Sequence, residues 1–201
     1  MEYVAGMSYT ITVKKSVLKR FDRLPKNVQV RFYLLVNALQ ADGPVGGHTF
    51  PNYSKLKEGE YHCHLNRSYV ACRRHYRKTI TIEIMSEAVK THRINISFKS
   101  RTPARVLNSI RKQYAEYIDD DNELIDITTT DWYKKKKTEM TLGKTLKTLR
   151  EMKNLTQAKL GGLVDIPTAR ISDFETGQRA ISKEAAKKLA KVFRRSPAVF
   201  I

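Results

Sequence analysis

The stretch Leu155–Gly177, LTQAKLGGLVDIPTARISDFETG, constrains the fold of this chain more than any other. It predicts a short helix, a tight turn and a second short helix. Thr156 is a candidate N-cap, and apolar residues follow it at helical spacing. Pro167 interrupts the first helix, because the residue before a proline disfavours helical angles. The second helix is expected over Thr168–Glu175, and Gly177 ends it.

Over residues 140–201, this pattern resembles the helix-turn-helix of the phage repressor/Cro family. The matching features are Thr156-Gln157-Ala158, the bend before Thr168, and Ile171-Ser172 followed by Phe174-Glu175-Thr176-Gly177. The resemblance implies an all-α domain whose second helix enters the major groove of DNA. A helical hairpin that only stabilises the fold is the alternative.

The resemblance also implies which side chains face DNA and which hold the domain together. Thr168, Ala169 and Arg170 would meet base edges, while Gln157 would act on phosphate at a helix N-terminus. An ion pair between Arg150 and Glu175 is expected between two helices. The full DNA-facing set is Gln157, Thr168, Ala169, Arg170, Asp173, Arg179, Ser182 and Lys183.

The charge of the 201-residue chain favours a polyanionic partner, since the formal net charge is +18. Residues 1–85 carry 14 basic and 6 acidic side chains, residues 86–139 carry 11 and 9, and residues 140–201 carry 13 and 5. Two basic ends therefore flank a nearly neutral middle. This pattern predicts two surfaces that face polyanions, joined by a segment with another task.

Other compositional features narrow the setting. Cys63 and Cys72 form neither a disulfide framework nor a zinc-site spacing, which favours a reduced, cytoplasmic location. The longest apolar run, Phe32–Val36, is too short to span a membrane, and residues 1–10 lack the pattern of a secretory signal. We expect no metal site and no cofactor.

The N-terminal part alternates elements typical of a small α+β domain. The predicted strands, helices and loop follow from period-two and helical apolar patterns. A hairpin turn is expected at Asn66-Arg67. The expected elements are a strand over Ser8–Lys14, helices over Ser16–Leu24 and Asn27–Ala41, a loop over Gly46–Ser54, and strands over Tyr61–Leu65, Ser68–Arg73 and Thr79–Ile84.

This order of elements resembles the RelE/HigB-like toxins, with two helices on an antiparallel sheet. The segments SYTITVKKSVLKRFDRLPK and LKEGEYHCHLNRSYVACRRHYRKTITIEI carry the resemblance. It implies a ribonuclease that cuts messenger RNA on the ribosome. Such cleavage needs proton acceptors, proton donors and cations, for which the candidates are His62, His64, Arg73 and His75.

Two features bear on whether these candidates act. His62 and His64 share one face of a strand, as do Arg73 and His75, because side chains alternate. A solvated sheet surface explains the two histidines as well as catalysis does.

The family's short tail with a basic and an aromatic residue is replaced here by Met85–Val89. A possible ribonuclease within residues 1–92 is therefore expected to be impaired, and a second protein would begin near Met85.

The middle of the chain predicts a βαβ unit over Arg93–Lys99, Thr102–Tyr117 and Glu123–Thr129, with an acidic turn at Asp119–Asn122. Together with the helix-turn-helix, this unit resembles HigA-type antitoxins, in which the extra part holds the toxin. The segment Trp132–Met140 contains four consecutive lysines and is expected to be a solvated basic linker.

The sequence thus predicts an α+β protein with four parts: a toxin-like domain (1–85), a toxin-binding segment (86–131), a basic linker (132–139) and a DNA-binding domain (140–201). The predicted function is a homodimeric transcriptional repressor of the toxin–antitoxin type, bound to double-stranded operator DNA. The alternatives are a ribonuclease toxin restrained by its fused antitoxin, and a pure interaction scaffold in which both activities are lost. Besides DNA, the expected partners are mRNA on the ribosome or a separate toxin chain.

Overall fold

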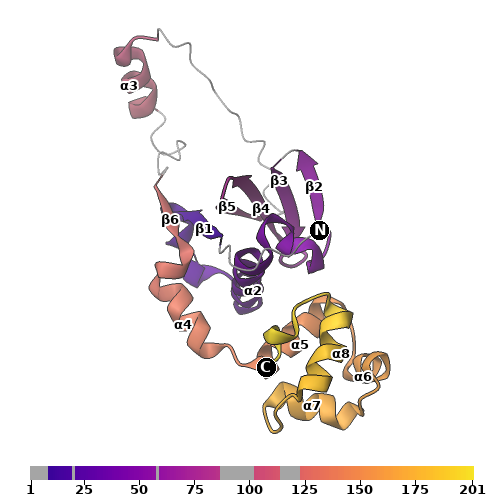
Figure 1. Cartoon of the computed structure of the whole chain (residues 1–201). Helices are drawn as coiled ribbons and strands as arrows, with labels where there is room; N and C mark the ends of the chain where they lie inside the picture. The colour runs from indigo at the N-terminus through magenta and orange to yellow at the C-terminus, as the bar shows by residue number, and fades with distance from the viewer. Residues whose placement is uncertain (1–8, 20, 58, 87–101, 114–122) are drawn as a thin grey trace.

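The structure is a computed structural model that describes residues 9–19, 21–57, 59–86, 102–113 and 123–201. Its N-terminal part contains a six-stranded sheet in the order β2-β3-β4-β5-β1-β6 (Figure 1). The pair β1–β5 is parallel and every other pair is antiparallel, so the sheet is mixed, and the expected antiparallel arrangement is wrong for β1–β5. The strands are β1 (Thr10–Lys14), β2 (Ser54–Lys57), β3 (Glu60–His64), β4 (Tyr69–Tyr76), β5 (Thr79–Ser86) and β6 (Leu124–Asp126).

The sheet buries one face against helix α2 (Lys26–Asp42). Alternation places Ile11 and Val13 of β1 on this face, and both are fully buried. Phe32 and Leu35 of α2 belong to the same core cluster. The long apolar helix and the alternating strands therefore form one hydrophobic core, as their sequence patterns predict.

Two local predictions for this part are wrong. The helix expected over Ser16–Leu24 is divided into α1 (Lys15–Leu18) and the 3-10 helix η1 (Phe21–Arg23). This division lets Phe21 turn into the core, where its ring lies 4.8 Å from that of Phe32. The loop expected over Gly46–Ser54 contains the end of a 3-10 helix, η2 (Gly43–Thr49), and leads into β2. The sequence of β2 has no clear alternating apolar pattern, so it could not be predicted as a strand. Its pairing with β3 holds it in the sheet.

The middle of the chain completes the N-terminal sheet. β5 continues through Met85 to Ser86, with Met85 opposite Val70 of β4. After helix α3 (Ala104–Gln113), strand β6 pairs antiparallel with β1 at the edge of the sheet. The expected strand Arg93–Lys99 and the acidic turn Asp119–Asn122 lie outside the described residues, as does the end of the expected helix beyond Gln113.

The segment expected as a linker is helix α4 (Asp131–Glu139), which follows the 3-10 helix η3 (Ile127–Thr129). Ile127 is fully buried, and the Trp132 ring stacks on that of Phe21 at 4.6 Å. The Tyr133 hydroxyl donates to Oδ1 of Asn37 on α2 at 2.6 Å. Three of the four lysines, Lys134, Lys135 and Lys137, are exposed as the sequence predicts. The start of α4 is nevertheless part of the packed N-terminal core.

The C-terminal part is all-α. Its N-caps follow the sequence closely: the side chains of Thr141, Thr156 and Ser182 each accept a hydrogen bond from the first turn of the helix they precede. The elements are α5 (Leu142–Met152), α6 (Gln157–Val164), α7 (Thr168–Thr176), α8 (Lys183–Phe193) and the 3-10 helix η4 (Pro197–Val199).

The two parts contact each other through α2, α5 and the segment after α8. Nη1 of Arg195 lies 3.3 Å from Oδ2 of Asp42, and the guanidinium also lies over the Phe50 ring. Burial lowers the pKa of Arg195, while the Asp42 carboxylate acts in the opposite direction. Within the described ranges, no helix is both long enough and apolar enough to cross a membrane.

Candidate nucleic-acid interface

The turn between α6 and α7 depends on two backbone features. Asp165 adopts a left-handed conformation at φ 51° and ends α6. A Cβ on Gly161 would lie 2.6 Å from the carbonyl oxygen of Ile166, so the turn approaches α6 too closely for any other residue. Pro167 then precedes α7, and Gly177 ends it at φ 79°. The chain therefore forms the helix-turn-helix that Leu155–Gly177 predicts.

Helix α7 presents one side to the core and the other to solvent. Ile171 and Phe174 are buried, whereas Thr168, Ala169 and Arg170 are exposed. Asp173 is half-buried. The exposed residues lie in the first turn, the part of such a helix that reaches base edges in a major groove.

The Arg150–Glu175 pair holds α5 against the end of α7. Nη2 of Arg150 lies 2.9 Å from Oε2 of Glu175, and Nε donates to the other carboxylate oxygen. The two side chains are only 11% and 3% exposed. The hydrogen bonds to Glu175 are the main cause that raises the pKa of Arg150, against the opposing effect of burial. Pairing and hydrogen bonding together compensate two charges taken out of water.

Gln157 is turned toward this ion pair. Its Nε2 donates to Oε2 of Glu175 at 2.9 Å, so its amide joins α6 to α7. A side-chain contact from Gln157 to DNA phosphate would require that hydrogen bond to break. This differs from the role implied by the sequence resemblance, which did not indicate that Gln157 is a second hydrogen-bond partner of Glu175.

The residues expected near the DNA backbone lie around the start of α8. Arg179, Ser182 and Lys183 are all exposed. The Ser182 hydroxyl is used as the N-cap acceptor for Ala185, which leaves the guanidinium of Arg179 and the ammonium of Lys183 as the charged groups. These two cations can neutralise phosphates without reading sequence.

The four ribonuclease candidates do not converge on one face of the sheet. Tyr61 lies opposite Arg73, and His62 lies opposite Cys72. Because paired residues share a face, His62 and His64 lie on one side, and Arg73 and His75 on the other. The candidates are therefore two separate pairs.

A longer hairpin turn is the reason. A two-residue turn at Asn66-Arg67 would place Arg73 opposite Glu60, on the face of His62. Instead, Oδ1 of Asn66 accepts from the backbone N–H groups of Ser68 and Tyr69, and Leu65 N–H donates to the Tyr69 carbonyl. The added residue shifts the register by one and moves Arg73 to the other face.

Arg73 is buried beside two tyrosines that the sequence analysis missed. It is 2% exposed, and its guanidinium carbon lies 5.3 Å from the ring centre of Tyr53 and 5.7 Å from that of Tyr61. Its nitrogens have no hydrogen-bond partner among the described residues. Burial lowers the pKa of Arg73. Tyr61 could be identified only as the cross-strand neighbour of Arg73. That pairing cannot be predicted unless the register between β3 and β4 is known.

The histidines have different surroundings. Nδ1 of His62 lies 3.0 Å from the Ser54 hydroxyl, and the His62 and His64 ring centres are 5.9 Å apart. Burial, then the neighbouring His64 and Arg73, lower the pKa of His62. His75 bonds through Nε2 to the carbonyl oxygen of Arg77, and its ring packs edge-on against Tyr9. His62 is thus disposed to stay neutral, whereas His75 is bonded to the turn that follows β4.

Comparison with known proteins bears on the C-terminal part. The family model described as Helix-turn-helix matches residues 146–200. Searches of curated proteins and of solved structures found no match. The matched range begins within α5 and includes α6, α7 and α8, so it supports a DNA-binding transcriptional regulator.

Proposed function

We propose that this chain is a sequence-specific transcriptional repressor of the toxin–antitoxin type, in which α7 reads operator DNA. The observation that carries the proposal is the exposed first turn of α7, held in place by the buried Arg150–Glu175 pair within the region matched as helix-turn-helix. A stabilising hairpin would not need to leave this turn exposed.

Each exposed residue has a defined task in this proposal. Arg170 suits the two major-groove acceptors of guanine, and the methyl group of Ala169 suits that of thymine. Thr168 donates or accepts a hydrogen bond. Arg179 and Lys183 contact phosphates on either side and fix the orientation of α7. Gln157 contributes indirectly, because its amide holds Glu175.

The repressor acts as a homodimer in this proposal. Two copies of α7 would enter successive major grooves, so the operator would be an inverted repeat with half-sites about 34 Å apart. A gel shift of the whole chain with its own upstream DNA, followed by footprinting, tests this. We expect one protected inverted repeat. Protection of every sequence to the same extent would contradict the proposal.

The N-terminal part is proposed to be a toxin-like domain of low ribonuclease activity. His62 and His64 are separated by the sheet from Arg73 and His75, and Arg73 is nearly inaccessible. A single positioned acid or base contributes about 10²–10⁴-fold, so a divided set would cleave slowly. In the same proposal, β6 and α4 derive from an antitoxin segment that now packs within its own chain.

The alternative function is a ribonuclease restrained by its fused antitoxin. The neighbouring His62 and His64 rings favour it, because a neutral imidazole can accept a proton. Cleavage of ribosome-bound mRNA by the whole chain, compared with its His62→Ala and His64→Ala variants, separates the two. We expect weak cleavage or none. Strong cleavage that both substitutions abolish would establish the ribonuclease instead.

A further inference from the structure

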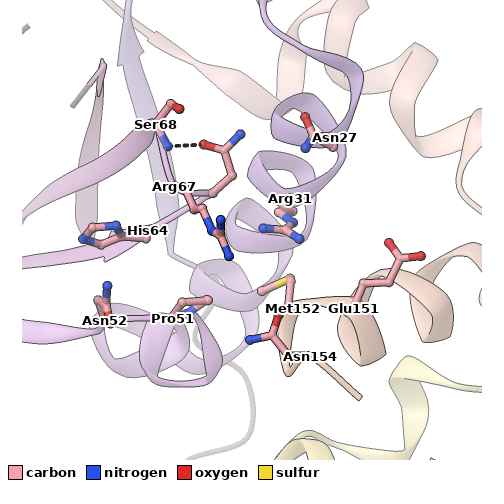
Figure 2. Close-up of a pocket in the computed structure, with 11 residues that line it drawn as sticks. Asn27, Arg31, Pro51, Asn52, His64, Arg67, Ser68, Glu151, Met152 and Asn154 are labelled. Atoms are coloured by element: carbon pink, nitrogen blue, oxygen red, sulfur yellow. Dashed lines mark hydrogen bonds between the residues drawn. The ribbon is translucent and has the colours of Figure 1, made fainter. Parts of the chain in front are cut away.

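A polar cleft of about 660 Å³ lies between the N-terminal sheet and the DNA-binding domain (Figure 2). Three segments line it: the beginning of α2, the β3–β4 turn with the residues before β2, and the end of α5 with the loop after it. Its volume is within the range of about 300–1,000 Å³ that small-molecule sites have. His64 of the histidine pair also lines it, whereas His62 and the residues of α7 do not.

Two arginines give this cleft its charge. The side chains of Arg31 on α2 and Arg67 in the β3–β4 turn both extend into it in Figure 2. Nη1 of Arg31 donates to the carbonyl oxygen of Leu65 at 2.7 Å. Burial lowers the pKa of Arg31, and the Glu151 carboxylate partly opposes this effect. Neither arginine forms a salt bridge within the part of the chain that the structure describes.

Two guanidinium groups directed into one cleft repel each other unless an anion lies between them. Glu151 is the acidic residue among those that line the cleft, so the two arginines leave a positive balance. Arginine offers a planar set of donors that matches a phosphate in a bidentate manner. The charges therefore favour a phosphate over a neutral ligand.

The rest of the lining suits a nucleoside. Asn27 and Asn154 supply amides that can donate and accept, and Met152 supplies an apolar wall with a polarisable sulfur that packs well against aromatic rings. The Glu151 carboxylate can accept from a ribose hydroxyl or a base amino group. A ligand that carries only phosphate would leave these groups unused.

We propose that the cleft binds a nucleoside phosphate, with its phosphate between Arg31 and Arg67 and its nucleoside against Met152, Asn154 and Glu151. Such a ligand would contact the N-terminal sheet and the DNA-binding domain at once. This inference does not depend on operator recognition, because none of the cleft residues belongs to α7.

Calorimetric titration of the whole chain with AMP, GMP, CMP and UMP, with a six-nucleotide RNA and with inorganic phosphate tests the proposal. We expect saturable binding of at least one mononucleotide or of the RNA, and weaker binding of phosphate alone. Preference for the RNA would identify a polymer as the source of the nucleotide, and preference for a mononucleotide would identify a free metabolite. Absence of saturable binding by all of them would overturn the proposal, as would phosphate binding as tightly as any nucleotide.

Variants locate the binding. Arg67→Ala removes an exposed cation and should weaken binding at least about tenfold, because its charge-assisted hydrogen bonds to the phosphate are lost. Arg31→Gln should weaken binding to a similar extent. Thermal unfolding of this variant checks that it is still folded. Arg23→Ala makes an equal change of charge outside the cleft and should bind nucleotide normally. Equal loss in Arg23→Ala, or none in Arg67→Ala, would place binding elsewhere.

Discussion

At the scale of single residues, the Glu175 carboxylate is the point at which three helices of the DNA-binding domain meet. Its carboxylate accepts from Arg150 and from Gln157, and thus joins α5, α6 and α7 at one point. Both members of the ion pair are nearly excluded from solvent. A buried charge of this kind stabilises a fold only while its counter-charge is present.

Glu175→Gln should therefore destabilise the chain by about 3–5 kcal/mol, because Arg150 would keep its charge without a counter-ion. Glu151→Gln is the matched control: Glu151 lies 4.0 Å from Arg150 but is 48% exposed, and its loss should cost less than about 1 kcal/mol. Urea unfolding of the two variants and the parent chain measures the difference. Equal midpoints for Glu175→Gln and Glu151→Gln would show that the pair contributes nothing as a pair.

Which residues share a face could be predicted from sequence within each strand but not between strands. Alternation alone groups His62 with His64 and Arg73 with His75. Whether the two pairs lie on the same face depends on whether the hairpin turn contains two residues or three. The side chain of Asn66 favours the three-residue turn through two hydrogen bonds to backbone N–H groups. No apolar pattern reports such a contact.

At the scale of elements, local signals were reliable and long-range pairing was not. The caps at Thr156, Ser182 and Gly177 and the helices they bound could be predicted, because the residues that form them are neighbours in sequence. β6 could be predicted as a strand, but its place beside β1 joins residues more than a hundred positions apart. The packing of α4 against the N-terminal core could not be predicted, because lysines dominate its sequence and only Trp132 and Tyr133 face the core.

The docking of α4 predicts a pH effect at its Tyr133. Burial raises the pKa of this phenol to about 12, with smaller contributions from Tyr33 and Asp126. An unfolded tyrosine ionises near pH 10, so between about pH 10 and pH 12 the folded state binds more protons and stability falls as pH rises. Tyr133→Phe should flatten this slope and cost about 0.5–1.5 kcal/mol at neutral pH through the lost hydrogen bond to Asn37.

Urea unfolding at several pH values compares the Tyr133→Phe variant with the parent chain. Tyr76→Phe is the control, because Tyr76 is 74% exposed. The same slope in parent and Tyr133→Phe chains would mean that Tyr133 ionises alike in the folded and unfolded states, and that α4 is not held to α2 as described.

At the scale of the whole molecule, the N-terminal sheet depends on residues that follow it by some forty positions. β6 covers the edge of β1, Ile127 is fully buried, and Trp132 stacks on Phe21. An uncovered sheet edge offers unpaired backbone groups to other chains. The boundary expected near residue 85 therefore does not coincide with the end of the packed core.

A fragment of residues 1–92 should consequently self-associate, whereas one of residues 1–139 should be monodisperse. Size-exclusion chromatography with light scattering at equal concentrations compares them. The longer fragment contains β6, η3 and α4 and lacks the DNA-binding domain, so it isolates the effect of the covered edge. A monodisperse and equally stable 1–92 fragment would show that β6 and α4 are dispensable.

The central claim is that the first turn of α7 reads DNA, and fluorescence anisotropy of the whole chain on its footprinted operator tests it most directly. Arg170→Ala should weaken operator binding by about 1–3 kcal/mol and relax the preference at one base pair, while Arg23→Ala leaves both unchanged. A uniform loss on operator and scrambled DNA would reassign Arg170 to phosphate. Unaltered affinity and preference in Arg170→Ala would contradict the account.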